Sequence, residues 1–292
     1  MVGAKAIMAR FISRLSPRAF FTIAYIHNRW RIPNFSRPKD LSEIWIRKIL
    51  SGEINRLAWL ADKYAVREYV QAKGLGNTLI PLLGFWDNAE DFKDAWETLP
   101  QSFALKMNFG AGMNIVVRDK AAFKASEVKE QLSRWLQKTT FSFSEGHYDT
   151  IPRKIMVEAL LTDGDGPLVD YKFICLHGEP VCCLVCVNRG EDSEEHVPYS
   201  VDWQPLYAWK RGGTFPRVER PAMLEEMLLA ARALAKEIDL CRIDLYNVQD
   251  KIYFGEITLT PAGAIFHNWS QKALDELGEM FRNKAVKVEK EL

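Results

Sequence analysis

The stretch RIDLYNVQDKIYFGEITLTPAG, residues 242–263, decides the fold of this chain. Two runs of alternating apolar and polar residues, 242–246 and 254–258, flank a polar turn at Gln249 and Asp250, and this pattern predicts a β-hairpin. Side chains on a strand alternate in direction, so the charged residues of both runs gather on one face. The hairpin therefore carries a charged face in a chain that is 48% hydrophobic.

The charged face of the hairpin brings two carboxylates together. The residues expected on it are Arg242, Asp244, Tyr246, Phe254, Glu256 and Thr258. Asp244 and Glu256 then lie opposite each other, and facing carboxylates repel unless a positive group lies between them. Mg²⁺ would resolve the repulsion, because it takes carboxylate oxygens and keeps its other positions for water and phosphate oxygens. A solvated hairpin with Arg242 as the counter-charge explains the spacing equally well.

The rest of the chain mixes hairpin-connected strands with helices. Apolar strands are expected at 154–161, 169–178 and 179–189, and a strong amphipathic helix at 222–238. Further expected elements are a helix at 55–73, an apolar run at 79–86, strands at 103–108 and 114–119, a polar helix near 122–138, an irregular stretch at 190–220 and a last helix near 270–285. This order predicts an α+β protein rather than a doubly wound parallel sheet.

The charge balance excludes several classes of protein. The formal net charge is +1, so a dedicated nucleic-acid-binding protein is not expected. No apolar run is long enough to span a membrane and no cleavable signal is recognised, which favours a cytoplasmic location. Residues 1–48 nevertheless hold ten Lys or Arg against Asp40 and Glu43. This segment either contacts an anionic membrane surface or polyanion, or forms a helix with a solvated basic face.

Three of the five cysteines lie in VCCLVCVN, residues 181–188. Cys183 and Cys186 have the C-x-x-C spacing of a metal or redox motif. No second pair stands at zinc spacing and the flanking residues are apolar, so buried thiols that pack as small apolar side chains are the favoured interpretation.

Other polar groups lie upstream of the hairpin. The loop KMNFGAGMN, residues 106–114, places Gly110 and Gly112 between two strands, where backbone N–H groups can surround an anion beside Lys106. An ordinary hairpin turn would have the same composition. Glu158 interrupts an apolar strand, and Asp170 and Lys172 share a face of the next one, where they could meet ribose and phosphate. An exposed edge strand is the alternative there.

The order of these pieces resembles the ATP-grasp superfamily, and in particular its TupA-like branch, which is associated with bacterial surface polysaccharides. LADKYAVREYV (60–70) and LIPLLGFWD (79–87) are also similar to that branch, so the resemblance covers about residues 40–265. It implies an α+β fold in which two subdomains clamp ATP, with a small subdomain at 56–153 and a large one at 154–292. A basic helical extension at 1–55 would replace the Rossmann-like first domain of most relatives.

The resemblance also implies roles for individual residues. Arg67 and Lys106 would lie near the phosphates and adenine, and Gly110 and Gly112 would lie in the loop over the triphosphate. Glu158 and the backbone of Ala159 and Leu161 would form the adenine hinge, with Asp170 at the ribose and Lys172 toward the phosphates. Arg242 would lie at the transition-state charge, and the metal would be held by Asp244, Glu256 and Thr258. Thr258 stands where many ATP-grasp ligases have asparagine, and NFGAGMN lacks the histidine and the serine or tryptophan expected of the branch.

Three functions are compatible with these residues. The first is an ATP- and Mg²⁺-dependent carboxylate–amine ligase that acts through an acyl phosphate, with Arg242, Lys106 and Lys172 as catalytic groups and a uronic acid or amino acid of a polysaccharide as substrate. The second is a kinase that phosphorylates a sugar or glycan. The third is a nucleotide-binding protein without turnover. Arg189 and His267 follow strands that point toward the proposed site, so they are candidates for the acceptor side.

Overall fold

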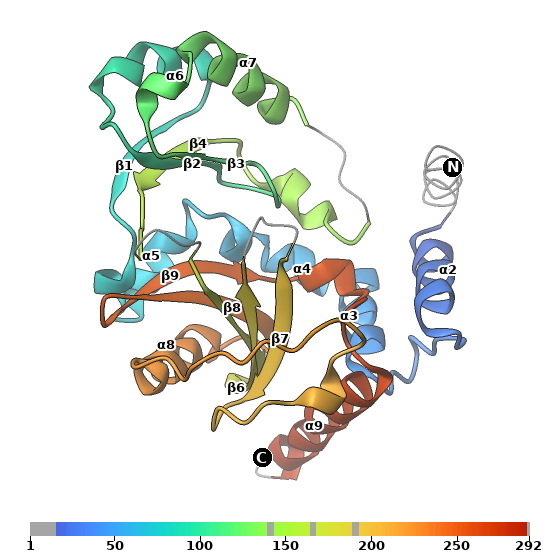
Figure 1. The fold of residues 1–292 in the computed structure, drawn as a ribbon. Helices are drawn as coiled ribbons and strands as arrows, with labels where there is room; N and C mark the ends of the chain where they lie inside the picture. The colour runs from blue at the N-terminus through green and yellow to red at the C-terminus, as the bar shows by residue number, and fades with distance from the viewer. Residues whose placement is uncertain (1–15, 139–142, 164–167, 189–192, 291–292) are drawn as a thin grey trace.

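The chain folds into two antiparallel sheets that lie one above the other, with helices on their outer sides (Figure 1). The computed structural model describes residues 16–138, 143–163, 168–188 and 193–290. All strand pairs within the two sheets are antiparallel. The predicted α+β class is therefore confirmed.

The smaller sheet has the strand order β1-β4-β2-β3. Its strands are β1 Leu82–Trp86, β2 Phe103–Met107, β3 Asn114–Val117 and β4 Ile155–Ala159. Burial alternates along β2, because Phe103 and Leu105 are fully buried whereas Lys106 is half-buried on the opposite face. Helices α6 (Ala89–Ala95) and α7 (Ala125–Leu136) pack against each other on the outer side of this sheet (Figure 1).

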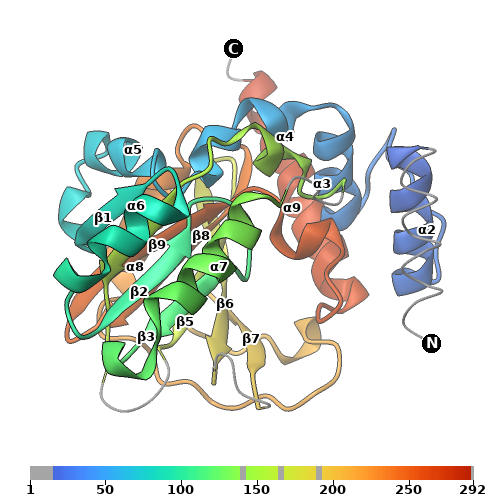
Figure 2. The same ribbon diagram turned by 90° about the horizontal axis from the view of Figure 1, so that it is seen from above.

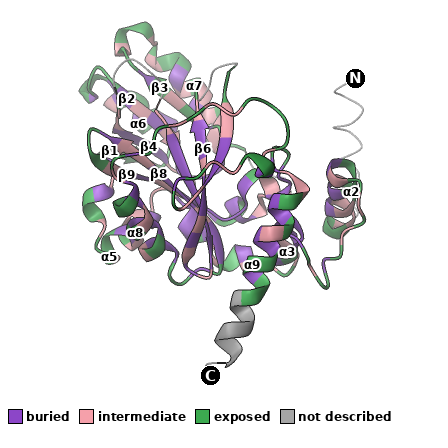
Figure 3. Cartoon of the chain, turned by 60° about the horizontal axis from the view of Figure 1, so that its bottom comes forward, coloured by how far each residue is buried: buried purple, intermediate pink, exposed green. Residues whose placement is uncertain are grey.

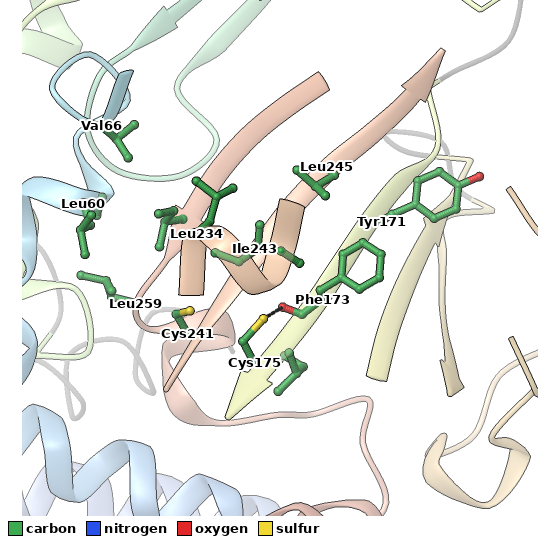
Figure 4. Close-up of a cluster of buried hydrophobic side chains, with 14 of the residues drawn as sticks. Leu60, Val66, Tyr171, Phe173, Cys175, Leu234, Cys241, Ile243, Leu245 and Leu259 are labelled. Atoms are coloured by element: carbon green, nitrogen blue, oxygen red, sulfur yellow. Dashed lines mark hydrogen bonds between the residues drawn. The ribbon is translucent and has the colours of Figure 1, made fainter. Parts of the chain in front are cut away.

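The larger sheet has the order β7-β6-β5-β8-β9. Its strands are β5 Asp170–Leu176, β6 Glu179–Val187, β7 Glu195–Ser200, β8 Leu240–Val248 and β9 Lys251–Thr258. Helix α8 (Leu224–Ala235) packs on β5, β6 and β8. Phe173, Ile243 and Leu245 are buried with Leu234 in the core beneath this sheet (Figure 4). Strand β7 lies within the stretch 190–220, which was expected to be irregular.

The hairpin of β8 and β9 has the predicted turn and one unpredicted bulge. Gln249 and Asp250 both have positive φ, as a two-residue turn that follows the twist of the strands requires. The register shifts between Asp244 and Leu245, so Asp244 pairs with Glu256 but Leu245 pairs with Phe254. The placement of Phe254 beside Glu256 on the charged face is therefore wrong, because the bulge turns its ring into the core.

The bulge explains the glycine at position 255. A Cβ atom added to Gly255 would lie 3.0 Å from the carbonyl oxygen of Asp244, which is closer than such atoms normally approach. Glycine therefore allows β9 to shift its register beside Asp244. The bulge lets Glu256 lie opposite Asp244 on the charged face while Phe254 packs in the core.

The helix expected at 55–73 is interrupted. The segment forms α4 (Glu53–Arg56), a short 3₁₀ turn η1 (Ala58–Ala61) and α5 (Val66–Ala72). The side chain of Asp62 accepts hydrogen bonds from the backbone N–H groups of Tyr64 and Ala65, and this local bonding replaces helical continuation. Asp62 also accepts a bond from Asn108 at 2.8 Å, which ties the break to the glycine loop.

Helix α2, the first helix of the described residues, lies at one side of the molecule (Figures 1 and 2). Helix α2 (Pro17–Arg29) is followed by α3 (Leu41–Leu50), which begins after Asp40 and packs on α9 (Gln271–Lys290). The Asp40 side chain caps α3 by accepting the Glu43 N–H, and it also accepts a hydrogen bond from the hydroxyl of Tyr25. Among the described residues, no helix combines the length and the apolar character needed to cross a bilayer.

The loop before α9 holds helix α2 in place. Arg29 donates hydrogen bonds to the backbone carbonyls of Trp269 and Phe266, and Asn28 contacts the ring of His267. His267, expected on the acceptor side, therefore serves to dock α2 and is otherwise exposed. Arg189, the other acceptor candidate, lies outside the described residues.

The sheets divide the chain at a different point from the predicted subdomains. Strand β4 pairs with β1 and β2, so the smaller sheet ends at Ala159 rather than at 153. The predicted boundary at 153 falls just before β4, whose ladder joins residues 155–159 to the strands before them. Turn η1, which was assigned to the small subdomain, contacts β9 of the larger sheet.

Candidate active site

One face of the larger sheet carries a row of charged residues. Lys172 on β5 pairs with Asp244 on β8, which pairs with Glu256 on β9. In the neighbouring row Arg242 pairs with Thr258. The opposite face of these strands supplies the core shown in Figure 4, so strand alternation alone separates the apolar and the charged sides.

Arg242 holds the two facing carboxylates together. Its Nε lies 2.6 Å from Oδ1 of Asp244 and its Nη2 lies 2.6 Å from Oδ2, which is a two-point contact of planar groups. The same Nη2 lies 3.4 Å from Oε1 of Glu256. The predicted opposition of Asp244 and Glu256 is confirmed. Arg242 is the counter-charge, but Asp244 is only 3% exposed, so the face is not the fully solvated hairpin face of the alternative interpretation.

Lys172 joins a third carboxylate to this centre. Its Nζ lies 3.0 Å from Oδ2 of Asp244 and 3.3 Å from Oδ2 of Asp170. All three side chains are buried. Burying a charge without a partner is costly, so the residues of this row stabilise one another.

The electrostatic balance of the centre keeps its groups charged. Desolvation would raise the pKa of Glu256, but Lys63, Arg242 and Lys172 outweigh it and lower the pKa to about 2. Desolvation would lower the pKa of Lys172 and of Arg242, but Asp244 outweighs it, and both values are raised. A charged, preorganised centre can stabilise charge that develops on a reacting group.

Lys63 connects the charged row to the glycine loop. Its Nζ donates a hydrogen bond of 2.9 Å to the carbonyl oxygen of Gly110 and lies 3.5 Å from Oε2 of Glu256. These two contacts place the Lys63 ammonium group between the glycine loop of the smaller sheet and strand β9 of the larger sheet. This residue was not predicted as part of the site, although it lies four residues before Arg67 in the stretch similar to the TupA-like branch.

The glycine loop lies between β2 and β3 and has the backbone shape of an anion cradle. Gly110 and Gly112 have φ values of 69° and 72°, which glycine adopts without strain. Buried Asn108 anchors the base of the loop by donating to the carbonyl of Pro152 and accepting the N–H of Lys154. Within the described part of the chain, the N–H groups of residues 110–112 have no hydrogen-bond partner.

Glu158 on β4 gathers two of the predicted nucleotide-binding cations. Its Oε2 lies 2.7 Å from Nζ of Lys106, and its Oε1 lies 3.1 Å from Nη1 of Arg67. Arg67 also donates to the carbonyl of Ile80 at 2.9 Å. An ammonium group has three donors, so Lys106 can bind Glu158 and a phosphate oxygen together.

The proposed hinge residues follow Glu158 at the end of β4. The N–H of Ala159 donates to the carbonyl of Pro81 at 2.9 Å. The sheet therefore already uses this N–H group, and the role of the Ala159 and Leu161 backbone at the adenine hinge stays a prediction. Leu161 lies beyond the strand and is half-buried.

The side chains of the charged row fit a magnesium ion in their chemistry. Asp244, Glu256 and Thr258 offer oxygen atoms, the donors that Mg²⁺ prefers. Thr258 Oγ1 donates to Oε1 of Glu256 at 2.9 Å, so its hydroxyl lies beside the carboxylate as a third oxygen. Arg242 and Lys172 already contact Asp244, and a cation would share this carboxylate with them.

Two further residues near the centre were not predicted. Tyr148 and His147 lie on the 3₁₀ turn η5 (Gly146–Thr150), which contacts α4 and η1. Burial, followed by the charge of Glu256, raises the pKa of Tyr148. Burial and the neighbouring Lys63 lower the pKa of His147 to about 4. The segment 139–150 has no regular apolar pattern, so no sequence signal indicated them.

Two facing sheets, a glycine loop and paired carboxylates on a hairpin are the arrangement that an ATP-grasp protein requires. A family model described as TupA-like ATPgrasp matches residues 42–282. The chain therefore belongs to the TupA-like ATP-grasp family, and the resemblance seen in the sequence is confirmed together with the fold it implied.

Solved structures with similar folds share little sequence with the chain. D-alanine–D-alanine ligase from Bacillus anthracis complexed with ATP is 16% identical, with a TM-score of 0.48 and coverage of 80% of this chain and 68% of that one. The corresponding ligase from Helicobacter pylori is 15% identical, with a TM-score of 0.44 and coverage of 75% and 60%. A carboxyaminoimidazole ribonucleotide synthase from Aspergillus clavatus complexed with ATP is 15% identical, with a TM-score of 0.41 and coverage of 75% and 47%.

The chain therefore spans less than two thirds of the length of two of these proteins. No curated protein matches it in sequence.

Proposed function

We propose that this protein is an ATP-dependent carboxylate–amine ligase. The observation that carries the proposal is the position of Lys63, which contacts both the glycine loop through Gly110 and the carboxylate centre through Glu256. A loop suited to phosphates thus adjoins paired carboxylates suited to a metal. Membership of the TupA-like ATP-grasp family supports the same assignment.

ATP would bind between the two sheets. The N–H groups of residues 110–112 and the ammonium group of Lys106 would hold the phosphates. Asp170 would accept a hydrogen bond from the ribose, and Lys172 would lie toward the phosphates. Arg67 keeps Glu158 neutralised, so the carboxylate can remain buried beside the nucleotide.

Asp244 and Glu256, with the hydroxyl of Thr258, would hold Mg²⁺. When bound, the ion would neutralise phosphate charge and orient the transferred group. The protein's own contribution is the fixed position of the carboxylates, which the β8–β9 ladder and Arg242 maintain. Positioning of this kind accounts for much of the catalysis in phosphoryl transfer.

The reaction would proceed in two steps. A substrate carboxylate oxygen attacks the γ-phosphorus of ATP, an acyl phosphate forms and ADP leaves. An amine nitrogen then attacks the acyl carbon, phosphate leaves and the amine proton passes to solvent or a base. Arg242 would stabilise the oxyanion of the second step, because its guanidinium is charged and held in place by Asp244.

By association with the TupA-like branch, the acid would be a uronic acid or amino acid of a bacterial surface polysaccharide or its precursor. The test is to measure ADP and phosphate release with a panel of uronic acids, amino acids and amines, and to weigh the products by mass spectrometry. A ligase gives a product without phosphorus and one phosphate per bond. A stable phosphorylated sugar identifies a kinase, and ATP binding without ADP release identifies a protein without turnover, so either result would reject the proposal.

We also propose that the protein works on the cytoplasmic side and contacts an anionic membrane surface through helix α2. Ile23 and Ile26 on α2 and Trp30, which directly follows its last residue, are exposed, with Trp30 at 86%. Figure 3 shows that helix α2 is only partly buried. The opposite face of α2, including Phe21 and Tyr25, is buried. An exposed apolar stripe with tryptophan beside a basic segment is typical of interfacial helices.

Co-sedimentation of the full chain with vesicles tests this contact. We expect binding to phosphatidylserine-containing vesicles but weak binding to phosphatidylcholine alone, and a decrease as salt increases. Replacing Ile23, Ile26 and Trp30 together by serine should abolish binding. Leu229→Ser, which removes another exposed apolar residue, should bind normally. Equal binding by the triple variant would reject the membrane contact.

A further inference from the structure

The charged face of the larger sheet continues past the proposed ATP site onto strands β6 and β7. Asp170 on β5 pairs with Cys186 on β6, and Cys186 pairs with His196 on β7. Directly opposed residues of a ladder lie on the same face, so these three belong to the face of Lys172. Two residues further along β5, Lys172 pairs with Asp244 on β8, so the charged row described above lies next to these three residues.

Cys186 differs from Cys183, its partner in the C-x-x-C spacing, in what it faces. Cys183 is an odd number of residues away, so it points to the opposite side, where it is fully buried in the apolar core. The C-x-x-C spacing thus places its two thiols on different faces. This orientation explains why the motif itself forms no site, and it leaves Cys186 among polar groups.

Glu194 completes a cluster of three different donors. The Cys186 sulfur, a carboxylate oxygen of Glu194 and a ring nitrogen of His196 all lie within 4.8 Å of one another. Nε2 of His196 lies 3.8 Å from Oε1 of Glu194. Ligand atoms of a tetrahedral zinc site lie roughly 3.5 Å apart, given metal–ligand bonds of about 2.0–2.3 Å. The side chain of Glu194 is exposed, so a rotation can bring its carboxylate closer.

The type of the three donors selects the metal. Sulfur with imidazole and carboxylate suits Zn²⁺, whereas Mg²⁺ prefers oxygen donors only. The imidazole ring of His196 supplies the nitrogen donor, and a neutral imidazole is the commonest metal-binding form of histidine. Three protein ligands leave a fourth position of a tetrahedral site open, as in catalytic zinc centres.

We propose that Cys186, Glu194 and His196 bind one Zn²⁺ ion, with an open position on the same sheet face as Lys172 and Asp244. That position would take water or an anionic oxygen of a ligand. Binding converts the Cys186 thiol to a thiolate and releases its proton to solvent. The site is distinct from the magnesium carboxylates in both its residues and its donor chemistry, and it needs no nucleotide.

Metal titration of the full chain without nucleotide tests the site. We expect one equivalent of Zn²⁺ to bind in competition with a chromophoric chelator. Co²⁺ should give a thiolate-to-cobalt charge-transfer band that Zn²⁺ removes and excess Mg²⁺ does not. His196→Gln and Glu194→Gln should each weaken binding by about tenfold or more, and Cys186→Ser should also remove the charge-transfer band.

His27→Gln is the matched control, because His27 is an exposed histidine on helix α2, which is not part of the sheet that carries this cluster. It should bind Zn²⁺ like the parent. Circular dichroism checks folding, and if Cys186→Ser fails to fold, the two other variants decide the matter. Absence of the cobalt band in the parent would overturn the proposal, and so would unchanged affinity in His196→Gln and Glu194→Gln. Because ATP turnover is not measured, these outcomes are independent of the ligase assignment.

Discussion

The ammonium group of Lys63 lies 3.5 Å from Oε2 of Glu256, and this contact joins the segment before α5 to the last strand of the larger sheet. The same ammonium group holds the carbonyl of Gly110. One side chain therefore sets the position of the glycine loop relative to the proposed metal carboxylates. Its loss should affect nucleotide binding more than folding.

Lys63→Met should weaken ATP binding by about tenfold or more, since a hydrogen bond to a charged group contributes about 1.5–3 kcal/mol. Isothermal titration with a non-hydrolysable ATP analogue and Mg²⁺ measures the change. Lys73→Met is the matched control, because Lys73 pairs with Glu237, whose side chain is 69% exposed. The control should bind normally. Equal affinities for parent and Lys63→Met would contradict the role of Lys63.

The sequence predicted the hairpin and its facing carboxylates because both follow from local rules. A two-residue polar turn and strand alternation place Asp244 opposite Glu256 without any knowledge of the fold. The bulge at Gly255 escaped prediction, since a glycine in a strand allows a bulge but does not require it. Phe254 was therefore assigned to the wrong face.

Lys63 and His196 escaped prediction for a different reason. Glu256, the partner of Lys63, is distant in the sequence, and His196 lies on β7, a strand that had no clear pattern in the sequence. A single sequence carries no signal for such contacts. The assigned nucleotide cations Arg67 and Lys106 did meet at Glu158, but their roles came from the family resemblance rather than from spacing.

Gly278 should be essential for the packing of α9 on α3. A Cβ atom at this position would lie 2.3 Å from the carbonyl oxygen of Lys39 and 2.7 Å from Cα of Asp40. Alanine favours a helix over glycine by about 1 kcal/mol, but overpacking against backbone costs about 1–3 kcal/mol or more. We therefore expect Gly278→Ala to lower the melting temperature.

Gly146→Ala is the control for that change. A Cβ atom at Gly146 meets nothing within 4 Å, and its φ is not positive. Thermal unfolding followed by circular dichroism should show little effect there. A Gly278→Ala protein as stable as the parent would mean that α9 and α3 can separate without cost.

His147 should make the protein less stable in mild acid. Its pKa falls from 6.5 to about 4 on folding, because burial and Lys63 disfavour the charged ring. The unfolded chain therefore binds a proton that the folded chain excludes, so stability is lost as the pH falls from about 6.5 toward about 4. The complete loss of this contribution corresponds to roughly 3 kcal/mol.

Urea unfolding between pH 7.5 and 4.5 tests this effect. Nε2 of His147 is buried and has no hydrogen-bond partner among the described residues, so phenylalanine can replace the ring without losing a bond there. His147→Phe should show a smaller loss of stability on acidification than the parent. The exposed His27→Gln variant should follow the parent. Parallel pH curves for parent and His147→Phe would exclude this histidine as the cause.

Thr258 should influence how the carboxylate centre would hold the proposed magnesium ion. Its hydroxyl donates to Oε1 of Glu256 and lies opposite Arg242 on the ladder, at the position where many ATP-grasp ligases have asparagine. Thr258→Asn supplies an amide oxygen, a better ligand for Mg²⁺ than a hydroxyl that is already donating. The Mg²⁺ concentration for half-maximal ADP release should fall, while the KM for the carboxylate substrate changes little.

Thr260→Asn, two residues beyond the end of β9, is the control and should leave the Mg²⁺ requirement unchanged. An unchanged or higher Mg²⁺ requirement in Thr258→Asn would place the ion away from this residue, on Asp244 and Glu256 alone.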